Sequence, residues 1–382
     1  MSTGKPIYLD NAATTPIAPE VLDEMIPFMR EHFGNPSSTH SYGRKAKDAI
    51  ETARRKVATL LGCSPAEISF TSGGTEADNL AIHTAIHKLG VKHIVSTRIE
   101  HKAVLNCIEY AVKQGWVDVH WLNLSEDGAI DLVELEDLLH SNEKVLVTLM
   151  HANNEIANLI DLKTIGDLCK AHNALFHSDT VQSMGHYRFD LDHTNVDFIT
   201  GAAHKFHGPK GVGFLYHRRE LGVLSLIHGG GQERNHRAGT ENIYGIIGLA
   251  KALDIAYADL DEHEAHIRGL KTQMMSELKS ALPEVEFNGQ SGSEDSLYTV
   301  LNVNFPKTDI ASMMLFRLDL EGVACSGGSA CSSGAGAGSH VLDAIKTCHD
   351  GPSVRFSFSR YTTTSDITSC VDRLAQLMIA DV

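Results

Sequence analysis

"GAAHKFHGPKGVG" spans residues 201–213, between the apolar segments "VDFIT" and "GFLYH". Both flanking segments are short and rich in β-branched and aromatic residues, so they are expected to be strands of one sheet. A lysine directly after a buried strand is partly desolvated, which lowers its pKa and frees its amine to attack a carbonyl group. Lys205 is therefore a candidate nucleophile. Lys210 lies between Pro209 and Gly211, where a solvated turn lysine is the more typical interpretation.

The segments around this stretch alternate between apolar strands and amphipathic helices. Strands are expected at 67–70, 92–97, 117–122, 144–150, 174–179, 196–200 and 211–217, and helices at 21–33, 44–62, 75–90, 101–115, 132–140 and 162–172. This alternation predicts an α/β fold with a mostly parallel sheet that helices cover on both faces.

The character of the sequence changes after about residue 245. A long helical stretch leads to expected strands at 296–305, 323–326 and 353–359, which alternate with helices at 310–322 and 365–378, the last with Ser365 as its N-cap. A smaller α+β domain is therefore expected. The predicted large domain covers 16–260, and the small one combines 1–15 with 261–382 and carries a cysteine loop at 325–339.

The composition excludes several classes of protein. The 382 residues carry a net charge of −15, which argues against nucleic acid or an anionic membrane surface as the main partner. No apolar run reaches the length of a membrane span, and the N-terminus has no secretory signal. Seven dispersed cysteines without a CxxC pair indicate a reducing compartment, so a cytoplasmic location is expected. Among the 22 histidines, no HxxxH pair or Cys/His cluster holds up as a zinc site, so no metal site is expected.

Two motifs stand where expected strands end. In "FTSGGTEADN", residues 70–79, two glycines turn a strand into a helix whose first N–H groups can bind a phosphate, although a plain strand–helix turn is an equally good interpretation. In "HSDTVQ", residues 177–182, Asp179 ends a strand and could face a ligand or simply cap the next helix. Together with Lys205, a glycine turn and a strand-end aspartate are the parts that pyridoxal phosphate requires.

Three further segments contain candidate functional residues. Cys331 lies in "CSGGSACSSGAGAGS", which is too poor in apolar residues to enter a core, so an exposed nucleophile is expected there. The glycine-rich stretch 228–242 includes Thr240 as a possible anion donor. Arg355 occurs within an expected apolar strand, where a guanidinium group requires a carboxylate partner from the protein or from a substrate.

The chain resembles the group I cysteine desulfurases, within the class V aminotransferase branch of fold-type I pyridoxal phosphate enzymes. The resemblance runs nearly from end to end through the family's motifs in order, which here read "YLDNAATTP", "GNPSSTHSYGR", "FTSGGTEADNLAI", "EHKAVL", "MHANNEIA", "HSDTVQ", "AHKFHGPKGVG", "GGGQERNHRAGTEN", "GSACSSG", "SHVL" and "VRFSFSRYTT". It implies conversion of L-cysteine to L-alanine, with the sulfur passed through a persulfide to an acceptor protein such as an iron–sulfur scaffold.

The resemblance also implies a role for each matching residue. Lys205 would form the Schiff base with the cofactor and move the α-proton, His101 would stack on the ring and act as acid or base, and Cys331 would accept the sulfur. The implied cofactor-binding residues are Gly74, Thr75, Asn154, Asp179, Gln182, Ala202, His204 and Thr240, the last reaching in from the partner subunit of a homodimer. Asn154 and Arg355 would bind the substrate carboxylate.

The sequence departs from the family pattern at three positions, and it is also compatible with other activities. Ala202 stands where the family usually has a phosphate-binding serine, Thr180 replaces a small residue, and Ala157 replaces a common glycine. A selenocysteine lyase on the same scaffold is a close alternative, and a class V transaminase is a weaker one because its chemistry has no use for a thiol. A non-enzymatic, metal-binding scaffold is the alternative of a different class.

Overall fold

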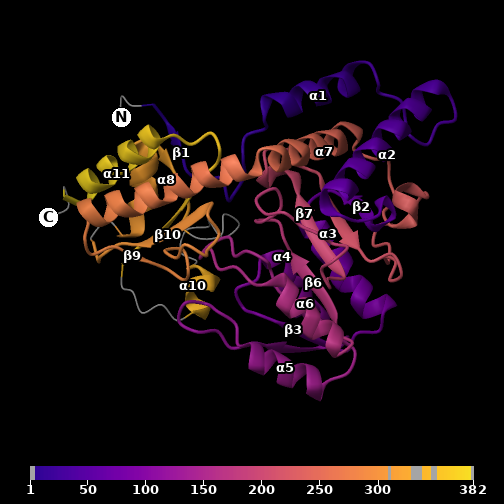
Figure 1. The fold of residues 1–382 in the computed structure, drawn as a ribbon, viewed down its shortest axis with the longest axis horizontal. Helices are drawn as coiled ribbons and strands as arrows, with labels where there is room; N and C mark the ends of the chain where they lie inside the picture. Colours follow the sequence, from indigo (N-terminus) through magenta and orange to yellow (C-terminus); the bar gives the residue numbers. More distant parts are fainter. Residues whose placement is uncertain (1–4, 309–310, 328–337, 346–350, 380–382) are drawn as a thin grey trace.

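The computed structural model describes residues 5–308, 311–327, 338–345 and 351–379. Its helices and strands alternate along the first two thirds of the chain, as the sequence predicts (Figure 1). The first elements are β1 (Ile7–Tyr8), α1 (Pro19–Arg30), α2 (Ser41–Leu61), β2 (Ile68–Thr71), α3 (Gly74–His83), β3 (His93–Ser96), α4 (Lys102–Lys113), β4 (Asp118–Trp121), α5 (Leu132–Ser141), β5 (Val145–Thr148), α6 (Leu162–Ala171), β6 (Leu175–Asp179), β7 (Phe198–Ala202) and β8 (Gly213–His217).

Seven strands form the central sheet in the order β2-β8-β7-β6-β5-β3-β4. The five strands from β7 to β4 are parallel, whereas β8 runs antiparallel to both β7 and β2. The prediction of a mostly parallel sheet is therefore confirmed. The order reverses direction between β3 and β5, and the carboxyl ends of the parallel strands lie along one edge, where open α/β sheets bind their ligands.

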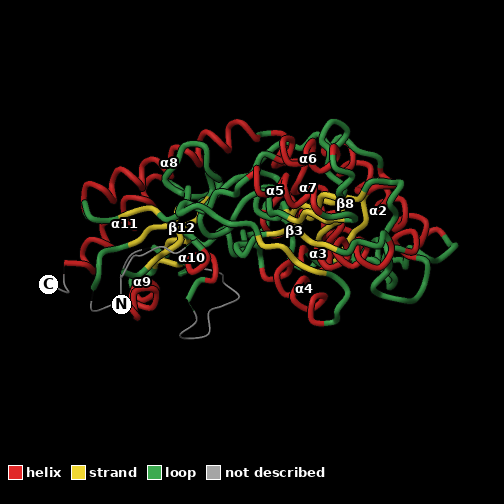
Figure 2. The backbone as a smooth tube through the Cα atoms, turned by 90° about the horizontal axis from the view of Figure 1, so that it is seen from below, coloured by secondary structure: helices red, strands yellow, loops and turns green. Residues whose placement is uncertain are grey.

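Helices cover both faces of this sheet. Figure 2 shows α3 and α4 on one side and α5, α6 and α7 (Ile243–Ala258) on the other. The strands β2, β5, β7 and β8 are buried throughout, because each face packs against a helix layer. Gly62 ends α2 with φ 66°, which confirms the helix stop predicted there.

The remaining elements build smaller sheets beside a second hydrophobic cluster. They are α8 (Leu260–Ala281), β9 (Glu286–Phe287), β10 (Val300–Asn304), α9 (Met314–Leu320), β11 (Val323–Ala324), α10 (His340–Ala344), β12 (Ser353–Ser357) and α11 (Thr364–Ile379). Antiparallel β12-β10-β9 form one sheet, and β1 pairs in parallel with β11. The largest cluster draws on residues 18–257, and the second on 7–9 and 267–374.

Local details differ from the sequence-based expectations at three places. Strand β10 begins only at Val300, because the residues before it form a turn. The N-cap of α11 is Thr363 and not Ser365: the Asp366 N–H donates to Thr363 Oγ1 over 3.2 Å, and the Asp366 carboxylate accepts from the Thr363 N–H over 3.0 Å. The third place is α1, where part of the expected apolar face is exposed.

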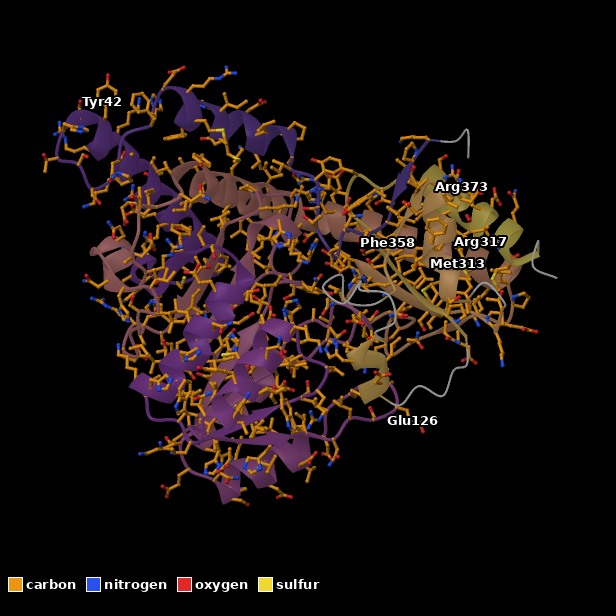
Figure 3. The ribbon with its side chains drawn as sticks, turned by 180° about the vertical axis from the view of Figure 1, so that it is seen from behind. Tyr42, Glu126, Met313, Arg317, Phe358 and Arg373 are labelled. Atoms are coloured by element: carbon orange, nitrogen blue, oxygen red, sulfur yellow. The ribbon has the colours of Figure 1, made fainter. Side chains whose placement is uncertain are left out.

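On α1, only part of the expected apolar face is buried. Val21 and Met25 pack into the core, but Leu22, Met29 and Phe33 are 44%, 46% and 68% exposed. Tyr42, at the start of α2, is also exposed and projects from the outer edge of the molecule (Figure 3). An apolar surface thus extends over α1 and the segment that follows it.

Candidate active site

Lys205 lies just beyond the carboxyl end of β7, in a short 3-10 helix over Ala203–Lys205. Its Nζ donates hydrogen bonds to the carbonyl oxygens of Ala12 and Ala13, in the segment that follows β1. The same segment is tied to this loop by the Thr15 N–H, which donates to the His204 carbonyl over 2.9 Å. The N-terminal segment therefore closes over the end of the sheet and fixes the position of the Lys205 amine.

A pocket of about 210 Å³ opens at this edge of the sheet. It brings together ten of the residues singled out from the sequence, which come from the ends of β6 and β7 and the residues just after them, from the starts of α3 and α4, from the loop after β5 and from β12. They are Gly74, Thr75, His101, Asn154, Asp179, Gln182, Ala202, His204, Lys205 and Arg355.

Asp179 is the last residue of β6 and is almost fully buried. Its Oδ1 accepts a hydrogen bond from the Val181 N–H over 2.9 Å, so the side chain caps the following turn while it also lines the pocket. Burial, and then the charge of Asp78, raise the pKa of Asp179 to about 6. Asp179 therefore lines the pocket, and it caps a turn rather than the start of a helix.

Asp78 and His101 complete the electrostatic environment of Asp179. Burial raises the pKa of Asp78 to about 7 and lowers the pKa of His101. The ligand atoms of Asp78, His101 and Asp179 lie within 4.8 Å of one another. Since the Ala103 N–H donates to His101 Nδ1 over 3.2 Å, that nitrogen acts as an acceptor, and the imidazole is held neutral at the start of α4.

The start of α3 provides the features that an anion site requires. A Cβ on Gly74 would lie 2.8 Å from Cγ2 of Val181, so only glycine permits this approach of the helix to the strand ends. The first N–H groups of the ten-residue helix point out of its N-terminus, and Thr75 is exposed beside them in the pocket. On the far side, His204 Nδ1 lies 3.2 Å from Thr14 Oγ1, and burial followed by the charge of Lys205 lowers the pKa of His204 to about 4.

Arg355 reaches the pocket from β12, with its side chain 1% exposed. Its Nη1 donates to the Asn154 carbonyl over 2.9 Å, and its Nη2 lies 3.0 Å from Oδ1 of Asp10. Its Nε is buried and has no hydrogen-bond partner among the described residues. A buried donor of this kind requires an acceptor, and a substrate carboxylate in the pocket would supply one.

Two predicted residues are not part of this pocket. Thr240 lines a separate cavity of about 170 Å³ with Thr71, Ser72 and Arg237, so within one chain it does not reach Lys205. Its expected contribution to a partner subunit remains a prediction. Cys331, with most of the 325–339 loop, lies outside the described residues.

Sequence reasoning missed three acidic residues around the pocket, namely Asp10, Asp78 and Glu100. Asp78 follows Gly74 by one helical turn, so the i,i+4 spacing within "GTEADN" was the available signal. Asp10 lies in the N-terminal motif, and Glu100 directly precedes His101. Their positions depend on contacts between segments far apart in the chain, which spacing alone does not give.

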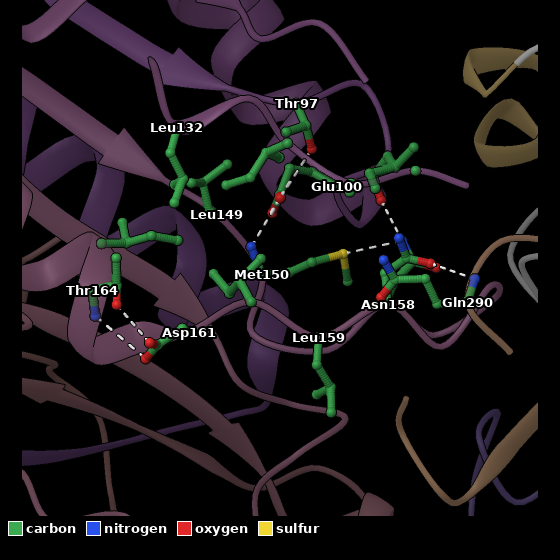
Figure 4. Close-up of a pocket in the computed structure, with 17 residues that line it drawn as sticks. Thr97, Glu100, Leu132, Leu149, Met150, Asn158, Leu159, Asp161, Thr164 and Gln290 are labelled. Carbon is green, nitrogen blue, oxygen red and sulfur yellow. Dashed lines mark hydrogen bonds between the residues drawn. The ribbon is translucent and has the colours of Figure 1, made fainter. Parts of the chain in front are cut away.

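Glu100 lines a second cavity, of about 300 Å³, that adjoins the pocket through Met150 (Figure 4). Its Oε1 accepts hydrogen bonds from the Met150 N–H over 2.8 Å and from Thr97 Oγ1 over 3.3 Å. Burial, and then the charges of Asp179 and Asp78, keep the pKa of Glu100 well above its usual range. Glu100 thus links the backbone just after β5 to the segment that positions His101.

The three departures from the family pattern have different structural settings. Ala202 is buried against the pocket and offers no side-chain donor. Thr180 Oγ1 donates to the Thr200 carbonyl over 2.7 Å, so its extra hydroxyl joins β6 to β7 rather than facing a ligand. Ala157 adopts φ 63°, a left-handed conformation that explains why glycine suits this position.

The described residues fit pyridoxal phosphate. Three buried carboxylates, those of Asp78, Glu100 and Asp179, have raised pKa values, and a cationic ring nitrogen beside Asp179 would relieve this uncompensated charge. The narrow glycine turn and helix N-terminus suit a phosphate, and the Lys205 amine lies in the same pocket. The residues that would hold the group are therefore Gly74, Thr75, Asp179, Gln182, His204 and Lys205.

Comparisons with known proteins agree with this geometry. The family model for aminotransferase class-V matches residues 7–370. A cysteine desulfurase IscS of Dictyoglomus turgidum is 40% identical over 378 residues, which cover 97% of this chain and 94% of that protein. A solved structure titled as a NifS-like protein superposes with a TM-score of 0.90 at 36% identity, over 98% of this chain and all of the other.

A second solved structure, of SspA in complex with cysteine, superposes with a TM-score of 0.79 at 33% identity, over 94% of this chain and all of the other. No described helix is long and apolar enough to cross a membrane. Because the family model spans nearly the whole sequence, the chain belongs to the class-V aminotransferases, a family of pyridoxal phosphate-dependent enzymes.

Proposed function

We propose that this enzyme is a cysteine desulfurase, which converts L-cysteine to L-alanine and passes the sulfur through Cys331 to an acceptor. The observation that carries the proposal is the pocket that combines the Lys205 amine, the buried Asp179 carboxylate and the unpaired Nε of Arg355. The names of the similar proteins support it, and so does SspA, which was solved with cysteine.

Arg355 binds and orients the substrate in this proposal. Its Nε points to no protein acceptor among the described residues, so a substrate carboxylate would form a charge-assisted hydrogen bond with it. Asn154, whose carbonyl already fixes Nη1 of Arg355, lines the same pocket and can add its side-chain amide. The amino acid is thereby held with its α-carbon toward Lys205.

Proton transfer is assigned to Lys205 and His101. Pyridoxal phosphate, when bound, supplies an electron sink that stabilises the charge left when an amino acid loses its α-proton. Asp179 would hold a proton on the ring nitrogen, since burial and the hydrogen bond from the Val181 N–H fix the position of its carboxylate. The Lys205 amine would take the α-proton, and the neutral His101 could accept or donate a proton.

Sulfur transfer is assigned to the Cys331 thiolate, on the basis of the motif around it. The thiolate forms an S–S bond with the substrate sulfur while the C–S bond breaks, and its electron pair stays on carbon. A proton then adds to that carbon, which gives alanine and leaves a persulfide on Cys331. A second thiol or a scaffold protein can accept the terminal sulfur by exchange.

A homodimer is part of the proposal. The segment that follows α1 lies beside the 228–242 segment, because Nε2 of Gln232 donates to Ser37 Oγ over 3.5 Å, while Oε1 of Gln232 accepts from the Gly239 N–H over 3.1 Å. A partner packed on the exposed apolar surface of α1 would cover Leu22 and Met29 and would receive Thr240 near its own phosphate site. The free cysteines among the described residues suit a reducing, cytoplasmic setting.

The experiment is alanine formation from L-cysteine by the holoenzyme and by the Cys331→Ala variant. We expect alanine with the wild type and a loss of nearly all turnover in the variant, whose cofactor absorption should be unchanged. Undiminished alanine formation by Cys331→Ala would reject the sulfur-transfer assignment. L-Selenocysteine, tested in parallel, separates the lyase alternative, which predicts turnover of that substrate alone.

A further inference from the structure

A cluster of three metal-ligating side chains lies outside the active site, on helices α5 and α6. It consists of Glu136 and His140 on α5 and of His172 at the end of α6, and their ligand atoms lie within 4.8 Å of one another. Nε2 of His172 is 3.9 Å from Oε1 of Glu136, and the rings of the two histidines meet edge to face with their centroids 4.3 Å apart.

The packing of α5 makes this arrangement a consequence of the sequence. Leu135 and Leu139 face the hydrophobic core, so the residues one position later, Glu136 and His140, share the outer face at the i,i+4 spacing. Figures 1 and 2 both show α5 and α6 as neighbours. The backbone N–H of His172 donates to carbonyls in the last turn of α6, which fixes this histidine as the helix C-cap.

The electrostatic setting favours a cation. His140 is in the last turn of α5 and His172 caps α6, so two helix C-termini direct partial negative charge toward the cluster. The neighbouring Lys170 points elsewhere, because its Nζ donates to Oδ1 of Asn195 over 3.0 Å. The 3.9 Å separation of His172 and Glu136 is too long for a hydrogen bond, so the two side chains leave room for a shared ion.

We propose that Glu136, His140 and His172 bind a divalent transition-metal ion, with two imidazole nitrogens and one carboxylate oxygen as ligands. This donor set suits Zn²⁺, and also Co²⁺ and Ni²⁺, with water in the remaining position. His172 precedes the first residue of β6, whereas Asp179 ends that strand, so the site lies at the amino end of the sheet and away from the cofactor pocket. The metal clamps α5 to α6.

Titration calorimetry measures Zn²⁺ binding to the holoenzyme, and thermal unfolding gives its melting temperature with and without Zn²⁺. We expect one saturable site and a raised melting temperature. His140→Ala and His172→Ala should each weaken binding by at least about tenfold and remove the shift in melting temperature. The matched control is His193→Ala, an exposed histidine 2.9 Å from Asp190 without a second histidine, and this variant should bind like the wild type.

Two outcomes would overturn the proposal. One is unchanged Zn²⁺ affinity in both variants, which would mean that the ion binds elsewhere, for instance at His83 and His87, whose rings stack against each other at the end of α3 and in the turn after it. The other is a Co²⁺ absorption spectrum that shows thiolate coordination in place of nitrogen and oxygen. Should either alanine variant fail to fold, Glu136→Gln removes the third ligand while it keeps the side-chain volume, and its Zn²⁺ affinity should also fall.

Discussion

The two ends of the parallel sheet hold ionisable side chains in opposite surroundings. At the carboxyl end, Asp78, Glu100 and Asp179 are buried, and their pKa values are raised because the protein withholds water from them. At the amino end, Glu136 and His140 are exposed to solvent. Buried charges carry a desolvation cost that a bound cation relieves, whereas exposed ones cost little when empty. The empty pocket is therefore less stable than the pocket with its ligand, whereas the exposed cluster costs little free energy when it is empty.

The largest expected effect is on enzymatic activity, and it distinguishes variants at the carboxyl end of the sheet from variants at its amino end. Lys205→Ala should lower the rate of alanine formation by at least about a thousandfold, because the amine that moves the α-proton is lost. His172→Ala, assayed without added metal, should stay within about twofold of the wild type. Lys210→Ala is the matched lysine control, since this residue is exposed in the same loop. Residual turnover by Lys205→Ala near that of Lys210→Ala would contradict the assignment.

Arg355→Lys should raise KM for L-cysteine by at least about tenfold, because lysine keeps the charge but loses the planar donors that hold Asp10, Asn154 and the substrate together. The cofactor absorption spectrum should be unchanged. Steady-state kinetics check the prediction. A KM equal to that of the wild type would mean that the carboxylate binds elsewhere.

Asp78→Asn tests whether a buried carboxylate at the carboxyl end of the sheet lowers the stability of the cofactor-free protein. The pKa of Asp78 rises from 3.8 to about 7 on folding, so the cofactor-free protein binds an extra proton between these values and loses stability as the pH rises through this window. The variant should therefore gain on the order of 1 kcal/mol or more, relative to the wild type, between pH 4 and pH 8. Urea unfolding of both cofactor-free proteins measures it, and a difference independent of pH would refute the explanation.

Ala202→Ser is expected to have the smallest effect. The added hydroxyl faces the pocket, where it can donate one hydrogen bond to a phosphate, so affinity for pyridoxal phosphate should tighten by about threefold to tenfold. Equilibrium titration of the cofactor-free protein follows this change. Weaker binding of pyridoxal phosphate by the variant would show that Ala202 differs from serine in more than the loss of one hydrogen-bond donor.

The functional residues at the carboxyl end of the sheet could be predicted from the sequence better than those at its amino end, for a physical reason. Lys205, Asp179 and Gly74 each lie at the end of a buried strand or just beyond it, and parallel strands bring their carboxyl ends to one edge, so strand patterns alone place these residues together. His140 and His172 are 32 positions apart on two helix surfaces, and only the packing of α5 beside α6 joins them. The spacing of histidines along the chain therefore does not indicate this cluster.

Other differences also arise from contacts between distant segments. Asp10 meets Arg355 because β1 pairs with β11 and lies beside β12, and no local pattern indicates that pairing. The exposed side chains of α1 follow a helical period, but the period does not say whether the core or another subunit covers them. At the start of α11, both Thr363 and Ser365 can cap a helix, and the contact of Thr363 with Asp366 selects Thr363.

The most direct test of the central claim is mass spectrometry of the holoenzyme after a brief reaction with L-cysteine and alkylation of its thiols. The account predicts one added sulfur atom on the peptide that contains Cys331, and none in the Lys205→Ala variant under the same conditions. Added sulfur on another cysteine, or on Cys331 at an undiminished level without Lys205, would contradict it.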